Sequence, residues 1–141
     1  MGALALIAAL ALQAASDSSA IEGIWRSPGG NSIIKIESCG DSPCGTVVWA
    51  TDSAQKASSK ATNQLVGTPL LTNLEQRKDG SWFGKLFIPD KNMRVTAKIQ
   101  RIGSDQLKVS GCAAGKALCR AAIWTAFTAA LPSDTSAIAP K

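Results

Sequence analysis

The sequence contains no histidine and no tyrosine among its 141 residues. Histidine is the side chain best suited to proton transfer near neutral pH, and it is the commonest protein ligand for metals. Its absence removes most hydrolase mechanisms and the usual way of activating a catalytic thiol. We therefore expect that the protein is not an enzyme and that it holds no metal or other cofactor.

Other signs of chemistry are scarce as well. The ten carboxylates are scattered mostly through turns and include no pair close enough in sequence to suggest an acid and a base. There is no glycine-flanked serine elbow, phosphate loop or dinucleotide fingerprint. The aromatic residues are four tryptophans and three phenylalanines, widely spaced, which argues against a base-stacking platform. The net charge of +5 is below that of a dedicated nucleic-acid binder, so no nucleic-acid partner is expected.

Long apolar runs are also missing. The run at residues 3–12 is too short to span a bilayer, and small residues follow it at 14–16 and 18–20. This pattern predicts a signal peptide over residues 1–20, cleaved after Ser16 or Ala20, and a periplasmic or secreted product that does not span a membrane. A buried N-terminal helix is the alternative, because no lysine or arginine precedes the run. One domain over 21–131 and a disordered tail over 132–141 would remain.

Four cysteines form two closely spaced pairs, Cys39 with Cys44 and Cys112 with Cys119. An even number of cysteines in an exported chain indicates two disulfides, and pairing across each local turn is the simplest of the three connectivities. The alternative is a zinc site with four thiolates, which would need a reducing compartment and the two turns side by side.

Short apolar segments separated by turn residues predict an all-β fold. The clearest segment is 93–101, where apolar residues from Met93 to Ile99 alternate with polar residues from Arg94 to Gln100. About eight such strands joined mainly by tight turns predict a small antiparallel up-and-down β-barrel, because closure removes unpaired strand edges. The last strand is expected at 120–127, although its alanines also suit a helix. The polar stretch 52–67 is the longest loop, either a lid or flexible filler.

Gly23-Ile24-Trp25 resembles the Gly-x-Trp signature of lipocalins, whose tryptophan closes one end of the barrel under an arginine from the last strand. This resemblance implies that Arg120, which begins the last predicted strand, is the partner of Trp25. A tryptophan that only fills the core is the alternative.

A wider pattern resembles the domain-of-unknown-function family 2147, which consists of short exported bacterial proteins with a lipocalin-like or calycin-like β-barrel. Its parts are Gly23-x-Trp25, the Cys39–Cys44 turn with Trp49, Gly67–Leu70, a strand from Gly84 to Pro89, Gly111-Cys112, Cys119-Arg120 and Trp124-Thr125. The resemblance covers about residues 21–127 and implies the fold and export, suggests small-ligand binding, and carries no established activity. Two positions depart from the family: Gln64 follows Asn63 where the family tends to have proline, and Ala126 stands where it tends to have arginine.

Two functions follow from this expected fold. In the first, the barrel interior binds a small apolar or amphipathic molecule, unless the same residues simply form a packed core. The interior residues expected to contact it are Trp25, Ile34, Ile36, Trp49, Leu86, Val95, Ile99, Val109 and Ile123. In the second, a basic outer face of Arg94, Lys98 and Lys108 holds an anionic component of the cell envelope. Exposed charges also protect strands from aggregation, which is the alternative for that face.

Overall fold

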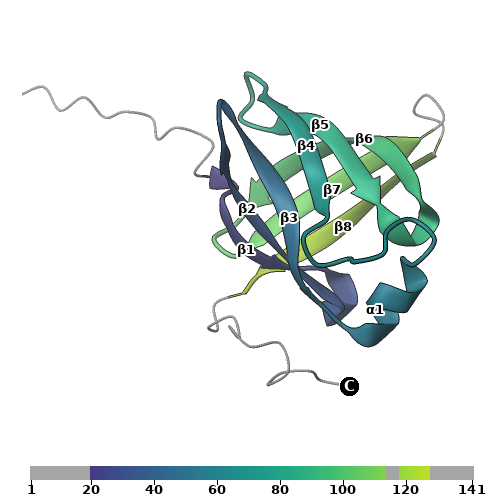
Figure 1. The fold of residues 1–141 in the computed structure, drawn as a ribbon. Helices are drawn as coiled ribbons and strands as arrows, with labels where there is room; N and C mark the ends of the chain where they lie inside the picture. The colour runs from purple at the N-terminus through teal and green to yellow at the C-terminus, as the bar shows by residue number, and fades with distance from the viewer. Residues whose placement is uncertain (1–19, 114–117, 128–141) are drawn as a thin grey trace, which may run out of the picture.

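The computed structural model describes residues 20–113 and 118–127, in which eight antiparallel strands form one closed barrel (Figure 1). Each strand pairs with its neighbours in the sequence, and the last pairs with the first. The strands are β1 (Gly23–Arg26), β2 (Ser32–Cys39), β3 (Ser42–Ala50), β4 (Pro69–Gln76), β5 (Trp82–Ile88), β6 (Met93–Ile102), β7 (Gln106–Ala113) and β8 (Leu118–Ala126). The predicted all-β, up-and-down barrel is confirmed. Residues 1–19 of the predicted signal peptide and the predicted tail at 132–141 lie outside the described residues.

The alternation predicted for β6 is present from Val95 onward, whereas Met93 is exposed, and it fixes the inside of the barrel. Val95, Ala97 and Ile99 are buried, whereas Arg94 and Thr96 are exposed. Across the β5–β6 ladder, Ile99 lies opposite Trp82 and Ala97 lies opposite Gly84. The even-numbered residues of β5 therefore point inward, because directly opposite residues of an antiparallel pair share one face of the sheet.

The centre of the barrel is packed. Ile34, Leu71, Ile99 and Leu107 have no accessible surface. A void that admitted water would leave accessible surface on the side chains around it, so the interior at these residues is filled by their own contacts.

β4 contains a bulge that rests on a glycine. The β4–β5 register shifts between Thr72 and Glu75, and Asn73 has a left-handed φ of 54°. A Cβ atom on Gly84 would lie only 2.6 Å from the carbonyl oxygen of Thr72 and from Leu74 Cδ2. The missing side chain of Gly84 thus allows the two strands to approach at the bulge.

The stretch predicted as the longest loop contains a short helix, α1 (Asp52–Ala57). Thr51 caps it, because its side-chain oxygen accepts a hydrogen bond from the Ala54 amide at 3.1 Å. Gln55 then holds the returning segment, accepting from the Leu65 amide at 2.7 Å and donating to the Asn63 carbonyl at 3.3 Å. Two 3₁₀ turns, η2 (Pro28–Gly30) and η3 (Pro89–Lys91), join β1 to β2 and β5 to β6.

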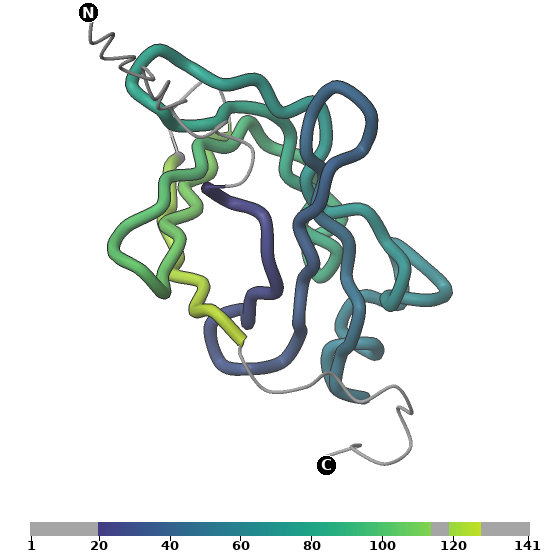
Figure 2. Tube along the Cα trace, turned by 90° about the vertical axis from the view of Figure 1, so that its left-hand side faces the viewer, coloured from purple at the N-terminus to yellow at the C-terminus, as the bar shows by residue number. Residues whose placement is uncertain are grey.

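The barrel closes through a short seam between its first and last strands. β1 pairs with β8 at two positions, Trp25 with Ala126 and Arg26 with Thr125. The Phe127 amide adds one bond to the Ile24 carbonyl at 2.9 Å. Figure 2 shows the end of β1, in purple, beside the end of β8, in yellow.

Candidate functional site

The structure places the residues predicted to line the barrel interior in four different environments. Five of them belong to the buried core cluster: Trp25, Ile34, Ile36, Ile99 and Val109. Leu86 is partly exposed and packs against this cluster. Trp49 and Val95 are also buried. The assignment of Ile123 was wrong, because its side chain is 38% exposed and it lies opposite Lys108 on the outer face of the β7–β8 pair.

The arginine that lies over Trp25 is Arg101 of β6. Its guanidinium carbon is 5.4 Å from the centroid of the indole ring, and the same side chain donates a hydrogen bond to the Ala20 carbonyl at 2.7 Å. The Trp25 indole donates to the Ile21 carbonyl at 3.0 Å. Arg120 had been expected in this place. It is exposed on β8 opposite Gly111, six positions before Ala126, the residue opposite Trp25.

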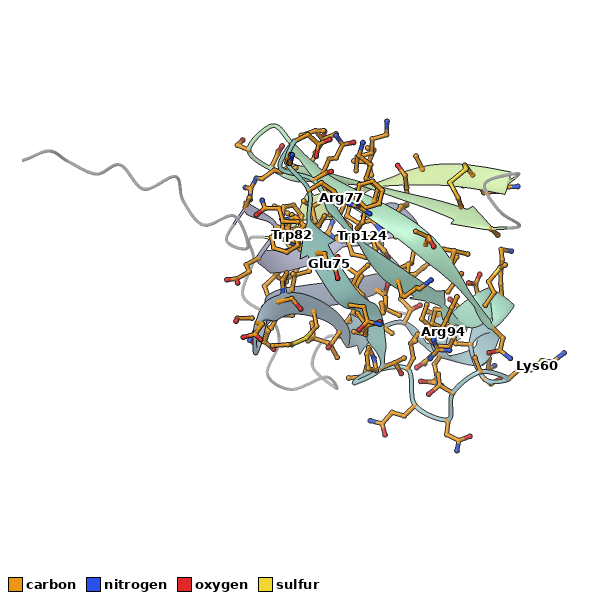
Figure 3. The ribbon with its side chains drawn as sticks, turned by 90° about the horizontal axis from the view of Figure 1, so that it is seen from above. Lys60, Glu75, Arg77, Trp82, Arg94 and Trp124 are labelled. Atoms are coloured by element: carbon orange, nitrogen blue, oxygen red, sulfur yellow. A yellow bond between two sulfur atoms is a disulfide. The ribbon has the colours of Figure 1, made fainter. Side chains whose placement is uncertain are left out.

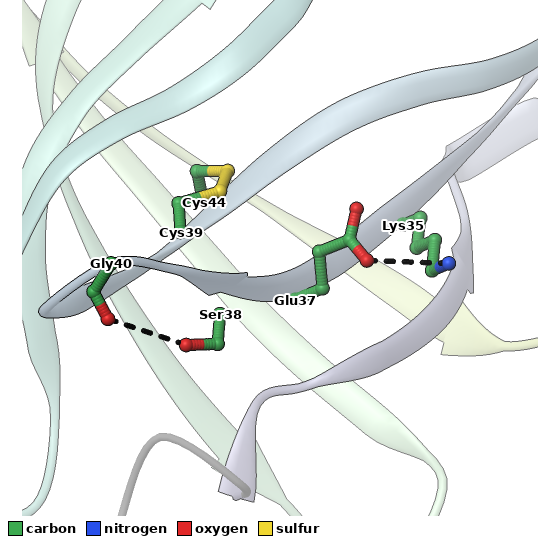
Figure 4. Close-up of a disulfide and its surroundings, with 6 residues drawn as sticks. All are labelled: Lys35, Glu37, Ser38, Cys39, Gly40 and Cys44. Atoms are coloured by element: carbon green, nitrogen blue, oxygen red, sulfur yellow. Dashed lines mark hydrogen bonds and ion pairs between the residues drawn. A yellow bond between two sulfur atoms is a disulfide. The ribbon is translucent and has the colours of Figure 1, made fainter.

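Both predicted disulfides are present, Cys39–Cys44 across the β2–β3 hairpin and Cys112–Cys119 across the β7–β8 pair. Figure 4 shows the first of them on its hairpin, with the Lys35–Glu37 ion pair further along β2 at 3.3 Å. All four thiols are used in these bonds, so the alternative of a four-thiolate zinc site was wrong. Within residues 20–113 and 118–127, no group of three or more potential metal ligands occurs.

Three consecutive cross-strand pairs on the outside of β5 and β6 bring cations and aromatic rings together. We call these pairs the outer ladder: Phe83 opposite Lys98, Lys85 opposite Thr96, and Phe87 opposite Arg94. Outward residues recur at every second position of a strand, so successive pairs lie about 7 Å apart. The ladder therefore presents a row of positive charges along one direction.

Contacts within the outer ladder hold its cations in place. Arg94 lies over the ring of Phe87 at 4.5 Å, and Lys98 lies over the ring of Phe83 at 5.8 Å. Lys85 is 3.5 Å from the Thr96 hydroxyl. Cations placed over aromatic faces keep their charge while losing freedom of movement. Arg77, at the other end of the face from Arg94 (Figure 3), also lies over Phe83, at 4.4 Å.

A groove of about 610 Å³ runs along the Arg94 end of the outer ladder. One wall is formed by the strands and the other by the segment after α1. The lining residues are Ala61, Thr62, Gln64, Val66, Gly67, Thr68, Pro69, Thr72, Lys85, Phe87, Asn92 and Arg94. Two of them are cations, none is a carboxylate, and several carry hydroxyl or amide donors. The groove is thus suited to an anionic group.

The structure brings together part of the predicted basic face and adds to it. Arg94 and Lys98 lie on the outer ladder, and Lys108 lies on β7 opposite Gln100, the next outward residue of β6. Lys85 and the two phenylalanines were missed. The sequence of β5 does not alternate clearly, because the outward residue Phe87 is apolar and buried. Ala61 and Val66, in the segment after α1, pack against the same apolar cluster as Phe87.

A second depression, of about 460 Å³, lies at the end of the barrel beside α1. Its apolar lining includes Val47, Leu65 and Leu70, and its polar lining includes Ser27, Asn31, Ser32, Ser53, Ser58 and Asp90. Because α1 and η3 are in contact here, the helix and the β5–β6 turn together narrow this end.

These observations define a small up-and-down β-barrel with a packed centre, two hairpin disulfides and a basic outer groove. In the part of the chain that the structure describes, no helix has the length and apolar character needed to cross a membrane. A family described as uncharacterized proteins conserved in bacteria (DUF2147) matches residues 23–126, and the chain belongs to this family. No curated protein and no solved structure matches the chain.

Proposed function

We propose that this is an exported binding protein of the bacterial cell envelope, not an enzyme, that holds an anionic envelope polymer against its outer ladder. The observation that carries the proposal is the groove in which Lys85 and Arg94 face threonine and asparagine side chains without any carboxylate. Arginine and lysine beside hydroxyl and amide donors are the usual means of binding phosphate and carboxylate groups.

Two further features support this proposal. The disulfides favour an oxidising compartment, where such bonds persist. The row of cations matches a ligand with repeating charge, because Arg94, Lys85 and Lys98 succeed one another along the ladder. The ring contacts of Arg94 and Lys98 restrict these two cations, which lowers the conformational entropy lost when a polymer binds.

The experiment uses a double variant that carries both Arg94→Ala and Lys98→Ala, and compares it with the unmodified protein. Binding of polyphosphate, a polymer of phosphate groups, and polygalacturonate, a polymer of carboxylates, is measured by calorimetry at several salt concentrations. Removing two cations should weaken the binding of the preferred polymer roughly tenfold or more. Raising the salt concentration should weaken polymer binding steeply for the unmodified protein and much less for the variant.

The control is the double variant Lys35→Ala with Lys56→Ala, which removes the same charge from β2 and α1. Its affinity should remain close to that of the unmodified protein. Equal losses in both double variants would mean that only net charge matters, and the proposal of a defined site would fail.

A second candidate function rests on the depression beside α1. Its floor of Val47, Leu65 and Leu70 under a rim of hydroxyl groups suits a small amphipathic molecule at the end of the barrel. Native mass spectrometry of the purified protein would test it. A retained small molecule that is lost on Leu70→Asp but kept in the Arg94 and Lys98 double variant would favour this depression over the outer ladder.

A further inference from the structure

The last four strands of the barrel contain no acidic residue. β5, β6, β7 and β8 include no aspartate or glutamate, whereas β2 contains Glu37 and β4 contains Glu75. The cations in these four strands are Lys85, Arg94, Lys98, Arg101, Lys108 and Arg120. No strand of this part of the sheet compensates their charge, so its outer face attracts anions over an area larger than the basic groove.

Outward residues of these strands form two rows that run across the sheet. In each row, every residue lies directly opposite the next one. The first row consists of Lys85, Thr96, Cys112 and Cys119. The second row consists of Phe83, Lys98, Ser110 and Ala121. The rows are about 7 Å apart, because outward residues recur at every second position of a strand.

A channel of about 460 Å³ lies between the two rows. Its floor is backbone, because the side chain of Ala97 is buried inside the barrel and the residue opposite it, Gly111, has none. Its sides are formed by Phe83, Thr96, Lys98, Ser110 and the Cys112–Cys119 disulfide. A phenyl ring, two sulfur atoms and the alkyl stem of a lysine are apolar, so the channel suits an apolar chain. We call it the outer channel.

The outer channel begins where the basic groove ends. Lys85 lines the groove and Thr96 lines the channel, and the Lys85 ammonium is 3.5 Å from the Thr96 hydroxyl. Arg94, the other cation of the groove, lies two residues before Thr96 on β6. From Lys85 on β5, the first row reaches the disulfide at β8 over three strand spacings, about 14 Å. The outer face thus offers a site for an anion and, directly beside it, an apolar track.

We propose that the outer channel takes the alkyl chain of an amphiphilic phosphate, the chemistry of the lipid-linked end of an envelope polymer. The phosphate lies between Lys85 and Arg94, and the chain passes Thr96 toward the disulfide. A polymer without a chain would leave the channel empty, and a neutral amphiphile would leave both cations without a counter-charge. This ligand assignment rests on the function proposed for the outer ladder, because the ladder supplies the two cations.

Calorimetry with butyl phosphate and octyl phosphate, each below the concentration at which it forms micelles, tests the proposal. Octyl phosphate should bind at least about tenfold more tightly, because it adds four methylenes and each fully buried methylene favours binding about fourfold. In nuclear magnetic resonance spectra, octyl phosphate should shift the backbone amide signals of Ser110 and Cys112, and butyl phosphate should not. Octyl glucoside, which has the same chain without the anion, should bind much more weakly than octyl phosphate.

Three variants separate the chain from the phosphate. Ser110→Gln places a longer polar side chain in the channel, so it should remove the preference for octyl phosphate and leave the affinity for butyl phosphate unchanged. Thr125→Gln, at an exposed position of β8 opposite Gln106, is the matched control outside the channel and should keep the preference. Arg94→Ala should weaken both phosphates by the same factor, because it removes a contact with the anion alone.

Equal affinities for butyl and octyl phosphate would overturn the proposal, and so would equal affinities for octyl phosphate and octyl glucoside. An octyl preference that persists in Ser110→Gln would also overturn it, because the chain would then lie elsewhere. Polyphosphate and polygalacturonate report separately on the outer ladder. If either polymer binds while chain length has no effect, the function proposed for the ladder stands and only the outer channel fails. If neither polymer and neither phosphate binds, both proposals fail.

Discussion

Arg101 lies over the indole ring of Trp25, with its guanidinium carbon 5.4 Å from the ring centroid. Both side chains donate hydrogen bonds to the segment that enters the barrel, Arg101 to the Ala20 carbonyl and Trp25 to the Ile21 carbonyl. Ile21 is itself buried in the core cluster. The pair therefore fastens the entering segment to one end of the barrel, and this arrangement leads to the first prediction.

Arg101→Ala should lower the free energy of unfolding by about 1 to 2 kcal/mol, since it removes the contact with the ring and the hydrogen bonds to three backbone carbonyls, those of Ala20, Gly103 and Ser104. Urea unfolding followed by tryptophan fluorescence measures the change. Arg120→Ala serves as the control and should change stability by less than about 0.5 kcal/mol, because Arg120 is exposed on β8. A larger effect at Arg120 than at Arg101 would contradict the assignment of the ring partner.

Gly84→Ala should destabilise the barrel by about 1 to 3 kcal/mol, as expected for an added methyl group in a close-packed place. The new Cβ would lie 2.6 Å from the Thr72 carbonyl oxygen, a backbone atom that cannot move aside without displacing the bulge. Thermal unfolding measures the loss. Ala121→Ser, at an exposed position of β8, is the comparison and should be nearly neutral.

Asp79 should make the stability of the β4–β5 turn depend on pH. Its Oδ1 accepts hydrogen bonds from the Ser81 hydroxyl at 2.6 Å and the Ser81 amide at 2.9 Å, and these bonds lower the pKa of the Asp79 carboxyl from its usual 3.8. A lowered folded-state pKa means that the stabilisation is fully present above the unfolded-state pKa and is lost as the pH falls through the folded-state pKa. Asp79→Asn should therefore be less stable than the unmodified protein at neutral pH. The difference should vanish in strong acid, as urea midpoints at the two pH values would reveal.

Removing either disulfide by paired alanine substitution should cost about 2 kcal/mol, because each bond closes a short loop. Urea titration of Cys39→Ala with Cys44→Ala, and of Cys112→Ala with Cys119→Ala, gives the two values.

Gln55→Ala should loosen the segment between α1 and β4 without unfolding the barrel. The substitution removes the bonds to the Leu65 amide and the Asn63 carbonyl, whose combined contribution is about 1 to 2 kcal/mol. Hydrogen exchange should become faster at Leu65 and stay unchanged at Ile99 in β6. Since this segment forms one wall of the basic groove, polymer binding should weaken as well. Unchanged exchange at Leu65 would mean that other contacts suffice to hold the segment.

The strands with one buried face could be predicted from the sequence, because the alternation of β6 records directly which residues meet the core. β8 was harder. Its alanines and Ile123 suit either face, and the orientation is set by register, which places Trp124 opposite Leu107 and Ile123 opposite Lys108. The helix α1 has only six residues and no buried one, so it leaves no apolar period to find.

The candidate sites depended even more on tertiary structure. Arg101 stands at the end of an alternating strand like any solvated charge, and only closure of the barrel brings it over Trp25. Arg94 and Lys98 could be assigned to one face from the sequence because they lie on one strand. Placing Lys85 beside them required the register of β5 against β6.

The seam between β1 and β8 has a consequence for how the barrel folds. β1 and β8 are the first and last strands of the barrel, and each supplies the other's missing neighbour. Without β8 in place, β1 and β7 would each keep an unpaired edge that can associate with other chains. Pairing of β8 with β1 is thus the step that removes the last unpaired edges and protects the folding chain from aggregation.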